Sequence, residues 1–406
     1  MIKVKLSEIC DLQNGYAFKS SDYVENSNTL SCRMSNIRLG GIFDIEYNPR
    51  FLPDSFADQY KGFLLKDGDL VIAMTDLAND PKLLGVPTLV QTDGRNILLN
   101  QRVGKLIIKD SSKVDNKYLQ HVLNDPKTRE YYRKFASGGL QINLGKSDLL
   151  NVEIPLPPLA EQRRIASILD QADELRQKRQ QAIEKLDQLL QATFIDMFGD
   201  PVSNPKGWDL VNLESLLAKK LISGAYFPKE TYVNSGGVPM VHMGDVFYGV
   251  VKPDNLKQVN ISNEEIKKYK ITNKDILIAR RSLTYDGAAK ACLVECSNQD
   301  MIFESSLIRL SPNLVKILPE FLYHYLNNND VRNKFIIPYI TKSTISGINQ
   351  ANLNKVTVLL PPLAKQEKFI EICDKFKQLG KTLTQDLSKL DELFKSLQNQ
   401  AFNGTL

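Results

Sequence analysis

The stretch Pro157-Pro158-Leu159-Ala160-Glu161-Gln162 recurs 204 residues later as Pro361-Pro362-Leu363-Ala364-Lys365-Gln366. Apolar residues follow each copy at alternating steps of three and four, which is the a/d pattern of a coiled coil. The first copy has Ile165, Ile168, Ala172, Leu175, Ala182, Leu186 and Leu189 at these positions. The second has Phe369, Ile372, Phe376, Leu379, Asp386, Leu390 and Leu393, apolar except for Asp386. Because one long helix is predicted twice, half a chain apart, the sequence indicates an internally duplicated protein.

Each predicted helix has about 40 residues and hence a length of about 60 Å. The first runs from about Leu159 to Phe198, where Gly199 and Pro201 supply a C-terminal stop. The apolar positions of both helices are buried most simply when the second runs back along the first. Arg179 is the polar exception in the first helix, and a single polar core position can fix the register of such a pair.

Length and composition fit two ordinary domains. The chain has 406 residues, of which 42% are hydrophobic and 24% charged, values typical of a soluble globular protein. No apolar run is long enough to cross a bilayer, and the first residues lack the layout of a signal peptide. We therefore expect a cytoplasmic protein with no membrane partner. The net charge of +5 is compatible with a polyanionic partner without requiring one.

The regions around the helices repeat a second plan. A strand is predicted at Leu70–Met74, another at Arg102–Ile108, and a helix from Asn116. Lys274-Asp275-Ile276-Leu277-Ile278-Ala279 matches the first of these strands, whereas the loops between such landmarks differ. We expect an α+β fold: two mixed α/β domains separated by an antiparallel pair of long coiled-coil-like helices, with approximate two-fold symmetry. The predicted segments are domain one at 1–156, helix one at 157–199, domain two at 200–360 and helix two at 361–406.

Motifs for catalysis are missing from the sequence. Gly139–Ser147 resembles a phosphate-binding loop but has five residues between its glycines where that loop has four. Neither double proline follows the Asn or Asp that an adenine methyltransferase needs. His121, His242 and His324 lie far apart, and the five scattered cysteines form no zinc pattern. We predict no catalytic residue, no metal site and no cofactor.

Basic and polar loop residues are the remaining signal. Two adjacent arginines, Arg280 and Arg281, follow the strand that ends at Ala279, where they could contact a phosphate and a guanine. A solvated turn is an equally good explanation for any one of these residues, because surface Arg and Lys are common. The candidate DNA-binding residues of the first half are Lys19, Arg33, Arg38, Thr75, Lys82 and Gln141. Those of the second half are Lys229, His242, Arg280, Arg281, Ser282, Tyr285, Lys342 and Ser343.

The double-proline motifs with their trailing helices, together with the segment Lys274–Ala279, resemble the specificity subunit of type I DNA restriction–modification systems. The likeness covers the whole chain and is strongest from Pro157 to Ile165 with its trailing helix. It implies two target recognition domains that each read half of a split site on double-stranded DNA, and two helical spacers. It also implies two methyltransferase subunits, docked on the helices, and ATP-dependent restriction subunits. The candidate partner-binding residues are Leu159, Gln162, Leu363 and Gln366.

Two other classes of protein stay open from the residues alone. A non-catalytic protein–protein scaffold predicts no salt-dependent DNA binding. A standalone nuclease or methyltransferase needs a catalytic tetrad or an acidic metal site that the sequence does not offer.

Overall fold

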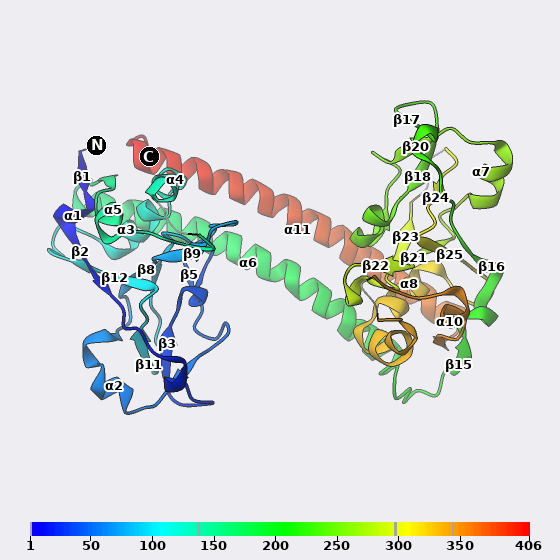
Figure 1. Cartoon of the computed structure of the whole chain (residues 1–406), viewed down its shortest axis with the longest axis horizontal. Helices are drawn as coiled ribbons and strands as arrows, with labels where there is room; N and C mark the ends of the chain where they lie inside the picture. The colour runs from blue at the N-terminus through cyan, green and yellow to red at the C-terminus, as the bar shows by residue number, and fades with distance from the viewer. Residues whose placement is uncertain (1, 136–138, 296–298, 343–344) are drawn as a thin grey trace. The chain divides into compact units, whose positions relative to one another are not determined.

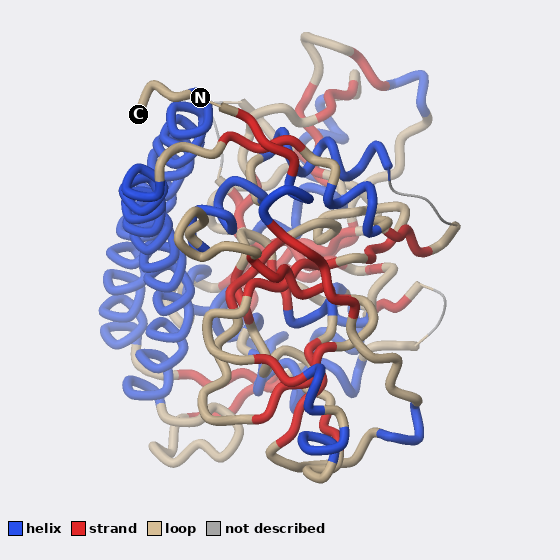
Figure 2. Tube along the Cα trace, turned by 90° about the vertical axis from the view of Figure 1, so that its left-hand side faces the viewer, coloured by secondary structure: helices blue, strands red, loops and turns tan. Residues whose placement is uncertain are grey.

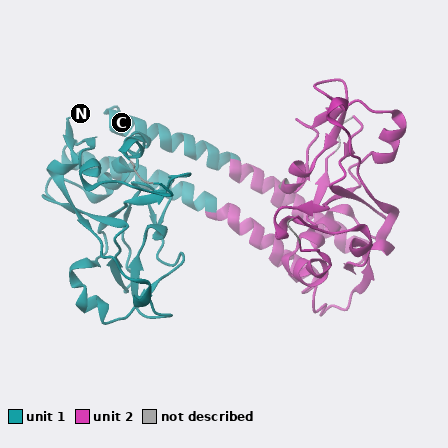
Figure 3. Ribbon diagram, viewed as in Figure 1, with its two compact units in different colours: residues 1–180, 385–406 teal, residues 181–384 magenta. Residues whose placement is uncertain are grey.

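The computed structural model describes residues 2–135, 139–295, 299–342 and 345–406. The chain forms two compact units (Figure 3). Unit 1 comprises residues 1–180 and 385–406, and unit 2 comprises residues 181–384. Each unit therefore combines a globular part with about half of each long helix.

Unit 1 is built on two four-stranded sheets with the strand orders β10-β8-β12-β2 and β6-β3-β11-β7 (Figure 1). The strands of the first sheet, in that order, are Pro87–Leu89, Leu70–Ala73, Val103–Ile108 and Cys10–Asn14. The strands of the second sheet, in that order, are Phe51–Leu52, Thr29–Cys32, Asn96–Leu99 and Leu64–Leu65. Strand β8 is apolar throughout because it is covered on both faces: Leu70 and Ile72 belong to one hydrophobic cluster, Val71 and Ala73 to another.

Short strand pairs and helices complete unit 1. The pairs are β1 with β14 (Lys3–Lys5, Glu153–Pro155), β4 with β5 (Ile37–Arg38, Ile42–Phe43) and β9 with β13 (Thr75–Leu77, Gln141–Asn143). The α-helices are α1 Leu6–Ile9, α2 Phe56–Gln59, α3 Asn116–Leu123, α4 Pro126–Phe135 and α5 Lys146–Leu150. The 3₁₀ helices are η1 Ser20–Asp22, η2 Met34–Asn36 and η3 Lys61–Phe63.

Unit 2 repeats this plan with a five-stranded sheet, β16-β25-β21-β23-β19, and a four-stranded sheet, β17-β20-β18-β24. The five strands are Leu217–Ser223, Leu307–Pro312, Ile276–Ala279, Ala291–Val294 and Val250–Val251. The four are Tyr232–Val233, Lys257–Val259, Val238–Val241 and Ile302–Phe303. Strand β21 corresponds to β8 and is likewise buried on both faces, with Ile276 and Ile278 in one cluster and Leu277 and Ala279 in another.

Short strand pairs and helices also complete unit 2. The strand pairs are β15 with β27 (Asp209–Asn212, Thr357–Leu360) and β22 with β26 (Arg281–Ser282, Ser346–Gly347). The α-helices are α7 Asn263–Tyr269, α8 Pro319–Asn327, α9 Asn329–Val331 and α10 Gln350–Asn354. A π-helix, η8, spans Arg332–Ile336. The 3₁₀ helices are η4 Leu213–Leu216, η5 Lys229–Thr231, η6 Met243–Tyr248, η7 Tyr285–Gly287 and η9 Ile337–Tyr339.

The long helices are α6, Leu159–Phe198, and α11, Leu363–Asn403, and they lie side by side (Figure 2). In unit 1, Arg176 Nε lies 2.6 Å from a carboxylate oxygen of Asp391, and Arg164 Nη2 donates to the carbonyl of Leu406. In unit 2, the Phe369 ring packs 5.5 Å from that of Phe194. The helices are thus antiparallel within each unit, and the predicted α+β fold with its long helices is confirmed.

Some of the predicted a/d positions are wrong. Leu175 and Leu189 of α6 are 54% and 50% exposed, and Leu379 and Leu393 of α11 are 47% and 49% exposed. A straight α-helix repeats every 3.6 residues and drifts about 20° per heptad from a strict 3.5 repeat. The inward face therefore moves to neighbouring residues such as Leu169, which is 0% exposed, whereas Leu383, the counterpart of Arg179 in the predicted pattern, is 7% exposed.

Candidate nucleic-acid interface

A two-stranded ribbon carries the candidate residues Thr75 and Gln141 of unit 1. The chain leaves the buried strand β8, forms β9, and pairs antiparallel with β13, so that Gln141 faces Leu77. Asp76 is buried in the middle of β9 and accepts hydrogen bonds from the backbone amides of Leu77, Leu83 and Leu84. The carboxylate therefore fixes the start and the end of the loop that follows the ribbon.

Unit 2 places its arginine pair on the equivalent ribbon. Strand β21 leads through Arg280 into β22, which pairs with β26. Ser282 is buried and its hydroxyl accepts from the amide of Thr284 at 3.1 Å, whereas Arg281 is exposed. A Cβ on Gly347 would lie 2.7 Å from the carbonyl oxygen of Arg280, so this crossing requires glycine.

Two buried arginines, which the sequence reasoning missed, hold the loops after the ribbons. Arg129 of α4 donates to the carbonyls of Lys82 at 2.6 Å and Leu84 at 2.9 Å. Arg332 of η8 donates to the carbonyls of Ala289, Asp286 and Ala288 at 2.8–3.1 Å. Burial lowers the pKa of Arg129 to about 10 and also lowers the pKa of Arg332. Their 203-residue offset was the available signal, because it matches the offset between α3 and α8.

Arg33 and His242 begin equivalent 3₁₀ turns. The Arg33 amide donates to Asn36 Oδ1, and the His242 amide donates to Asp245 Oδ2, both at 2.8 Å. In unit 1 this turn approaches the ribbon, because Thr75 Oγ1 lies 3.5 Å from the sulfur of Met34. The Nη1 atom of Arg33 is buried and has no hydrogen-bond partner within the described part of the chain.

The ring of His242 is oriented by two neighbours. Nδ1 lies 2.9 Å from the carbonyl of Met240, and Nε2 lies 3.0 Å from the hydroxyl of Tyr232. Because a carbonyl can only accept, we assign the proton to Nδ1, and Nε2 then accepts from the tyrosine.

Several candidate cations lie against aromatic rings or acids. Lys342 Nζ is 4.7 Å from the centre of the Tyr285 ring, which brings two candidates of unit 2 together. The Arg38 guanidinium lies 3.6 Å above the ring of Tyr47. Lys82 is paired with Asp80 at 2.6 Å, and hydrogen bonding to that carboxylate raises the pKa of Lys82.

The other candidate DNA-binding residues that the structure describes are either exposed or largely covered by their own unit. Lys19 caps η1 through its amide and is exposed, and Lys229 is exposed at the start of η5. Thr75 and Ser282 are 7% and 3% exposed, so their side chains are largely covered. Ser343 lies outside the described residues.

Large apolar side chains at the ribbons also escaped the sequence reasoning. Leu77 and Leu140 of unit 1 are 52% and 93% exposed, and Leu283 of unit 2 is 81% exposed. Leu77 and Leu283 stand 206 residues apart, the offset that also relates β8 to β21. That offset was visible in the sequence, but the exposure of the side chains was not.

The glutamines expected to bind partners are buried instead. Gln162 and Gln366 are both 0% exposed. Gln162 Nε2 donates to the carbonyls of Lys113 and Pro157, and its Oε1 accepts from the Asp115 amide. Each polar group has a partner inside the unit, so this side chain does not fit the expected role in partner binding. Leu159 and Leu363, at the helix starts, are half-buried.

Gln366 has the same environment in unit 2. Its Nε2 donates to the carbonyls of Lys316 and Pro361, and its Oε1 accepts from the amide of Leu318. We therefore assign both glutamines to the attachment of a long helix to its own unit.

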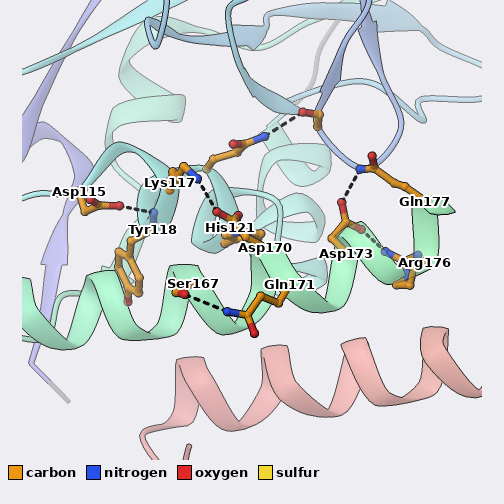
Figure 4. A network of polar contacts seen from close by, with 12 residues as sticks. Asp115, Lys117, Tyr118, His121, Ser167, Asp170, Gln171, Asp173, Arg176 and Gln177 are labelled. Atoms are coloured by element: carbon orange, nitrogen blue, oxygen red, sulfur yellow. Dashed lines mark hydrogen bonds and ion pairs between the residues drawn. The ribbon is translucent and has the colours of Figure 1, made fainter.

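A polar network joins α3 to α6 in unit 1 (Figure 4). His121 Nε2 and Lys117 Nζ each lie 2.7 Å from a different oxygen of Asp170. The hydrogen bond with His121 is the main cause that lowers the pKa of Asp170. In unit 2 the equivalent His324 packs against the ring of Phe369, with the ring centres 5.4 Å apart, and desolvation of the imidazole lowers its pKa to about 4.

The described residues contain no group of three or more His, Cys, Asp or Glu side chains placed to hold a metal ion. Within the same described ranges, none of the helices has the length and apolar character needed to span a membrane.

Comparison with known proteins gives a family match over both units. Residues 1–185 and 205–392 match the family model described as the type I restriction modification DNA specificity domain. The MjaVIII specificity subunit of Methanocaldococcus jannaschii is 35% identical over 189 residues, which are 45% of this chain and 42% of that protein. The EcoBI specificity subunit of Escherichia coli is 21% identical over 100% of this chain and 86% of its own. The match thus spans less than half the length of the M. jannaschii relative.

Solved structures agree on the fold. The type I S subunit from M. genitalium has a TM-score of 0.57 and 15% identity, and the match covers 99% of this chain and 96% of that one. A chain from a structure on complex assembly of a type I R-M system has a TM-score of 0.56 and 19% identity, covering 100% and 98%. At these identities the likeness concerns the fold alone.

Proposed function

Because this chain belongs to the family of type I restriction–modification DNA specificity domains, we propose that it recognises a bipartite site on double-stranded DNA. Residues 1–156 and 200–360 act as two recognition domains, and each reads one half of the site. Residues 157–199 and 361–406 form the helical spacers that set the distance between the half-sites. The protein acts in the cytoplasm, where its DNA target lies.

The observation that carries this proposal is the repeated ribbon with different side chains. Strands β9 and β13 occupy the place in unit 1 that β22 and β26 occupy in unit 2. The first of these strands reads Thr75-Asp76-Leu77 in unit 1, and the matching residues in unit 2 are Arg281-Ser282-Leu283. A common scaffold that presents different donors, acceptors and charges suits two readers with different base preferences.

Charge and hydrogen-bonding capacity support DNA as the ligand. Arg281 and Lys342 are exposed beside the unit 2 ribbon, and Gln141 lies on the unit 1 ribbon. Arginine and lysine contact phosphates and guanine, and glutamine can pair with adenine. Arg33 begins the turn that approaches the unit 1 ribbon through Met34. We propose the same role for the other candidates, including Ser343.

The chain contributes recognition, and partner subunits contribute the chemistry. We propose that two methyltransferase subunits dock on the long helices, and that ATP-dependent restriction subunits join them. The half-exposed leucines Leu175, Leu189, Leu379 and Leu393 offer apolar contact surface along both helices. Leu159 and Leu363 stay candidates for this contact, whereas the buried glutamines are withdrawn.

A domain exchange tests the proposal. Replacing residues 1–156 by the matching segment of another specificity subunit should change one half-site and leave the other intact. The exchange keeps β1 and its partner β14 in one donor segment, so the strand pair that closes the domain is preserved. Sequencing of methylated adenines in host DNA reads out both half-sites, and the matched control exchanges residues 200–360. A change in both half-sites, or in neither, contradicts the two-reader model.

A binding assay separates this function from a protein–protein scaffold. Affinity for the mapped duplex should fall steeply as salt rises from 50 to 200 mM, roughly 10³-fold or more if at least six phosphates are contacted. Duplexes with one altered half-site should bind more weakly. Binding that is independent of salt and sequence would support the scaffold instead.

A further inference from the structure

The two ribbons share one side chain where nearly everything else differs. Leu77 ends β9, and Leu283 follows β22 at the equivalent place. Both are exposed, at 52% and 81%. Single exposed apolar residues are common on protein surfaces and carry no message alone. Here two ribbons with different neighbouring residues have leucine at the same exposed place. This repeat is a more specific observation than a single exposed apolar residue.

The local geometry points these leucines outward together with polar readers. In unit 2, Arg281 and Leu283 are both exposed and flank Ser282, which is buried. In unit 1, Leu77 faces Gln141 across the ribbon. Leu140 lies at the same end, because its carbonyl accepts from the amide of Ala78 at 3.1 Å, and it is 93% exposed. Each ribbon therefore presents an apolar group beside a side chain able to hydrogen-bond to a base.

We propose that Leu77 and Leu283 each contact the 5-methyl group of a thymine in their own half-site, with Leu140 adding to the apolar surface in unit 1. The inference rests on the proposed function and adds residues to it. The major groove admits a two-stranded ribbon, and the thymine methyl is the apolar group that it displays. Contact with that methyl removes both apolar groups from water and distinguishes thymine from cytosine.

The charge around the ribbon favours DNA over a polypeptide partner. Arg281 is exposed next to Leu283, and Lys342 is held over the ring of Tyr285. An apolar protein surface would gain nothing from these cations, whereas DNA phosphates beside a thymine methyl match both the charge and the leucine.

The experiment couples a methyl group on DNA to a leucine on the protein. Each thymine of the mapped site is replaced in turn by deoxyuridine, which lacks only the 5-methyl group. Competition binding is measured with the full chain and the modification subunits that copurify with it. We expect one replacement in each half-site to weaken wild-type binding about fourfold, the factor that corresponds to burying one methylene-sized group.

The leucine variants should remove that sensitivity one half-site at a time. Leu283→Ala should bind the natural duplex several-fold more weakly and lose its response to deoxyuridine in one half-site only. The double variant Leu77→Ala/Leu140→Ala should do the same for the other half-site. Val315→Ala is the matched control, because Val315 is 77% exposed in unit 2 and lies outside the ribbon. It should keep both responses.

The outcomes separate this inference from the proposed function. Specific, salt-dependent binding in which Leu283→Ala keeps the full deoxyuridine response overturns the leucine contact and leaves DNA recognition standing. The same holds if no deoxyuridine replacement affects wild-type binding. If the wild-type complex binds no duplex specifically, both the recognition function and the leucine contact are wrong.

Discussion

Gln162 and Gln366 each hold the first turn of a long helix against the segment that leads into a short helix, α3 or α8, of the same unit. The three hydrogen bonds of each side chain have the same arrangement: two to carbonyls and one from an amide. Removing a buried amide side chain that makes these hydrogen bonds lowers the stability of the unit, because the removal leaves backbone groups without partners.

We predict that Gln162→Leu lowers the free energy of unfolding of unit 1 by about 2–4 kcal/mol, since three backbone groups lose their partner at a fully buried side chain. Urea denaturation of the wild type and the variant measures the change. Gln171→Leu on the exposed side of α6 is the control and should change stability by less than about 0.5 kcal/mol. Equal effects of the two variants would contradict the attachment role.

His324 predicts a pH dependence for unit 2. Its folded pKa is lowered by burial to about 4, partly opposed by Asp374, against about 6.5 in an unfolded chain. Between these values the unfolded chain binds a proton that the folded chain does not. Above pH 6.5 His324 is neutral in both states and does not reduce stability. As pH falls from 6.5 toward 4, the free energy of unfolding of unit 2 declines by up to about 3 kcal/mol.

The test compares wild type with His324→Gln at pH 7.5, 6.0 and 5.0 by thermal unfolding. The variant should lose less stability than the wild type on acidification, because glutamine does not titrate. Parallel declines in the two proteins would show that His324 stays accessible to protons in the folded state.

Sequence could predict which residues repeat but not which are exposed. The glutamine recurs in both copies of the motif, yet a glutamine is equally compatible with an exposed contact residue and with a buried residue that attaches the helix to its unit. Thr75 and Ser282 are candidates as polar residues of loops that follow a predicted strand, yet both are buried. Burial depends on strand pairing between distant segments, which no local pattern specifies.

At the scale of elements, long apolar periodicity was the reliable signal. Helix α6 spans Leu159–Phe198, the predicted range, and β8 and β12 lie within the predicted strands. The ribbons were not predicted, because β22 and β26 have two residues each and exist only through their pairing. The parts that would read DNA are therefore the parts that propensity describes least well.

Arg176 predicts how the two long helices are joined in unit 1. Its guanidinium lies 2.6 Å from Asp391 and from Asp173, and 4.6 Å from the centre of the Phe394 ring. We expect Arg176→Ala to loosen the C-terminal part of α11, with amide exchange in residues 385–403 at least several-fold faster by mass spectrometry.

Lys178→Ala is the matched control for that change. Lys178 pairs with Glu174 of its own helix, and both side chains are more than 60% exposed. Exposed pairs of this kind contribute about 0.5 kcal/mol or less, so exchange should stay near the wild-type rate. Equal acceleration in both variants would mean that Arg176 does not fasten the helices.

At the scale of the whole molecule, unit 1 is assembled from both ends of the chain. Ala401 belongs to its main hydrophobic cluster, against which Phe394, Leu397 and Phe402 also pack. The sequence predicts that the second long helix runs back along the first, and the C-terminal part of α11 belongs to unit 1. A helix that returns to the first unit ties the length of one spacer to that of the other.

The spacer role therefore predicts that both helices must change length together. Deleting residues 180–186 and 379–385 removes seven residues from each, which keeps the heptad register and shortens each helix by about 10.5 Å. At about 3.4 Å per base pair this corresponds to about three base pairs. The spacer between the half-sites, read from methylated adenines in host DNA, should shorten while both half-sites keep their sequence. Deleting residues 180–186 alone is the control and should abolish recognition, because the inward faces of α6 and α11 no longer match. A matched deletion that leaves the spacer unchanged would show that the helices do not set it.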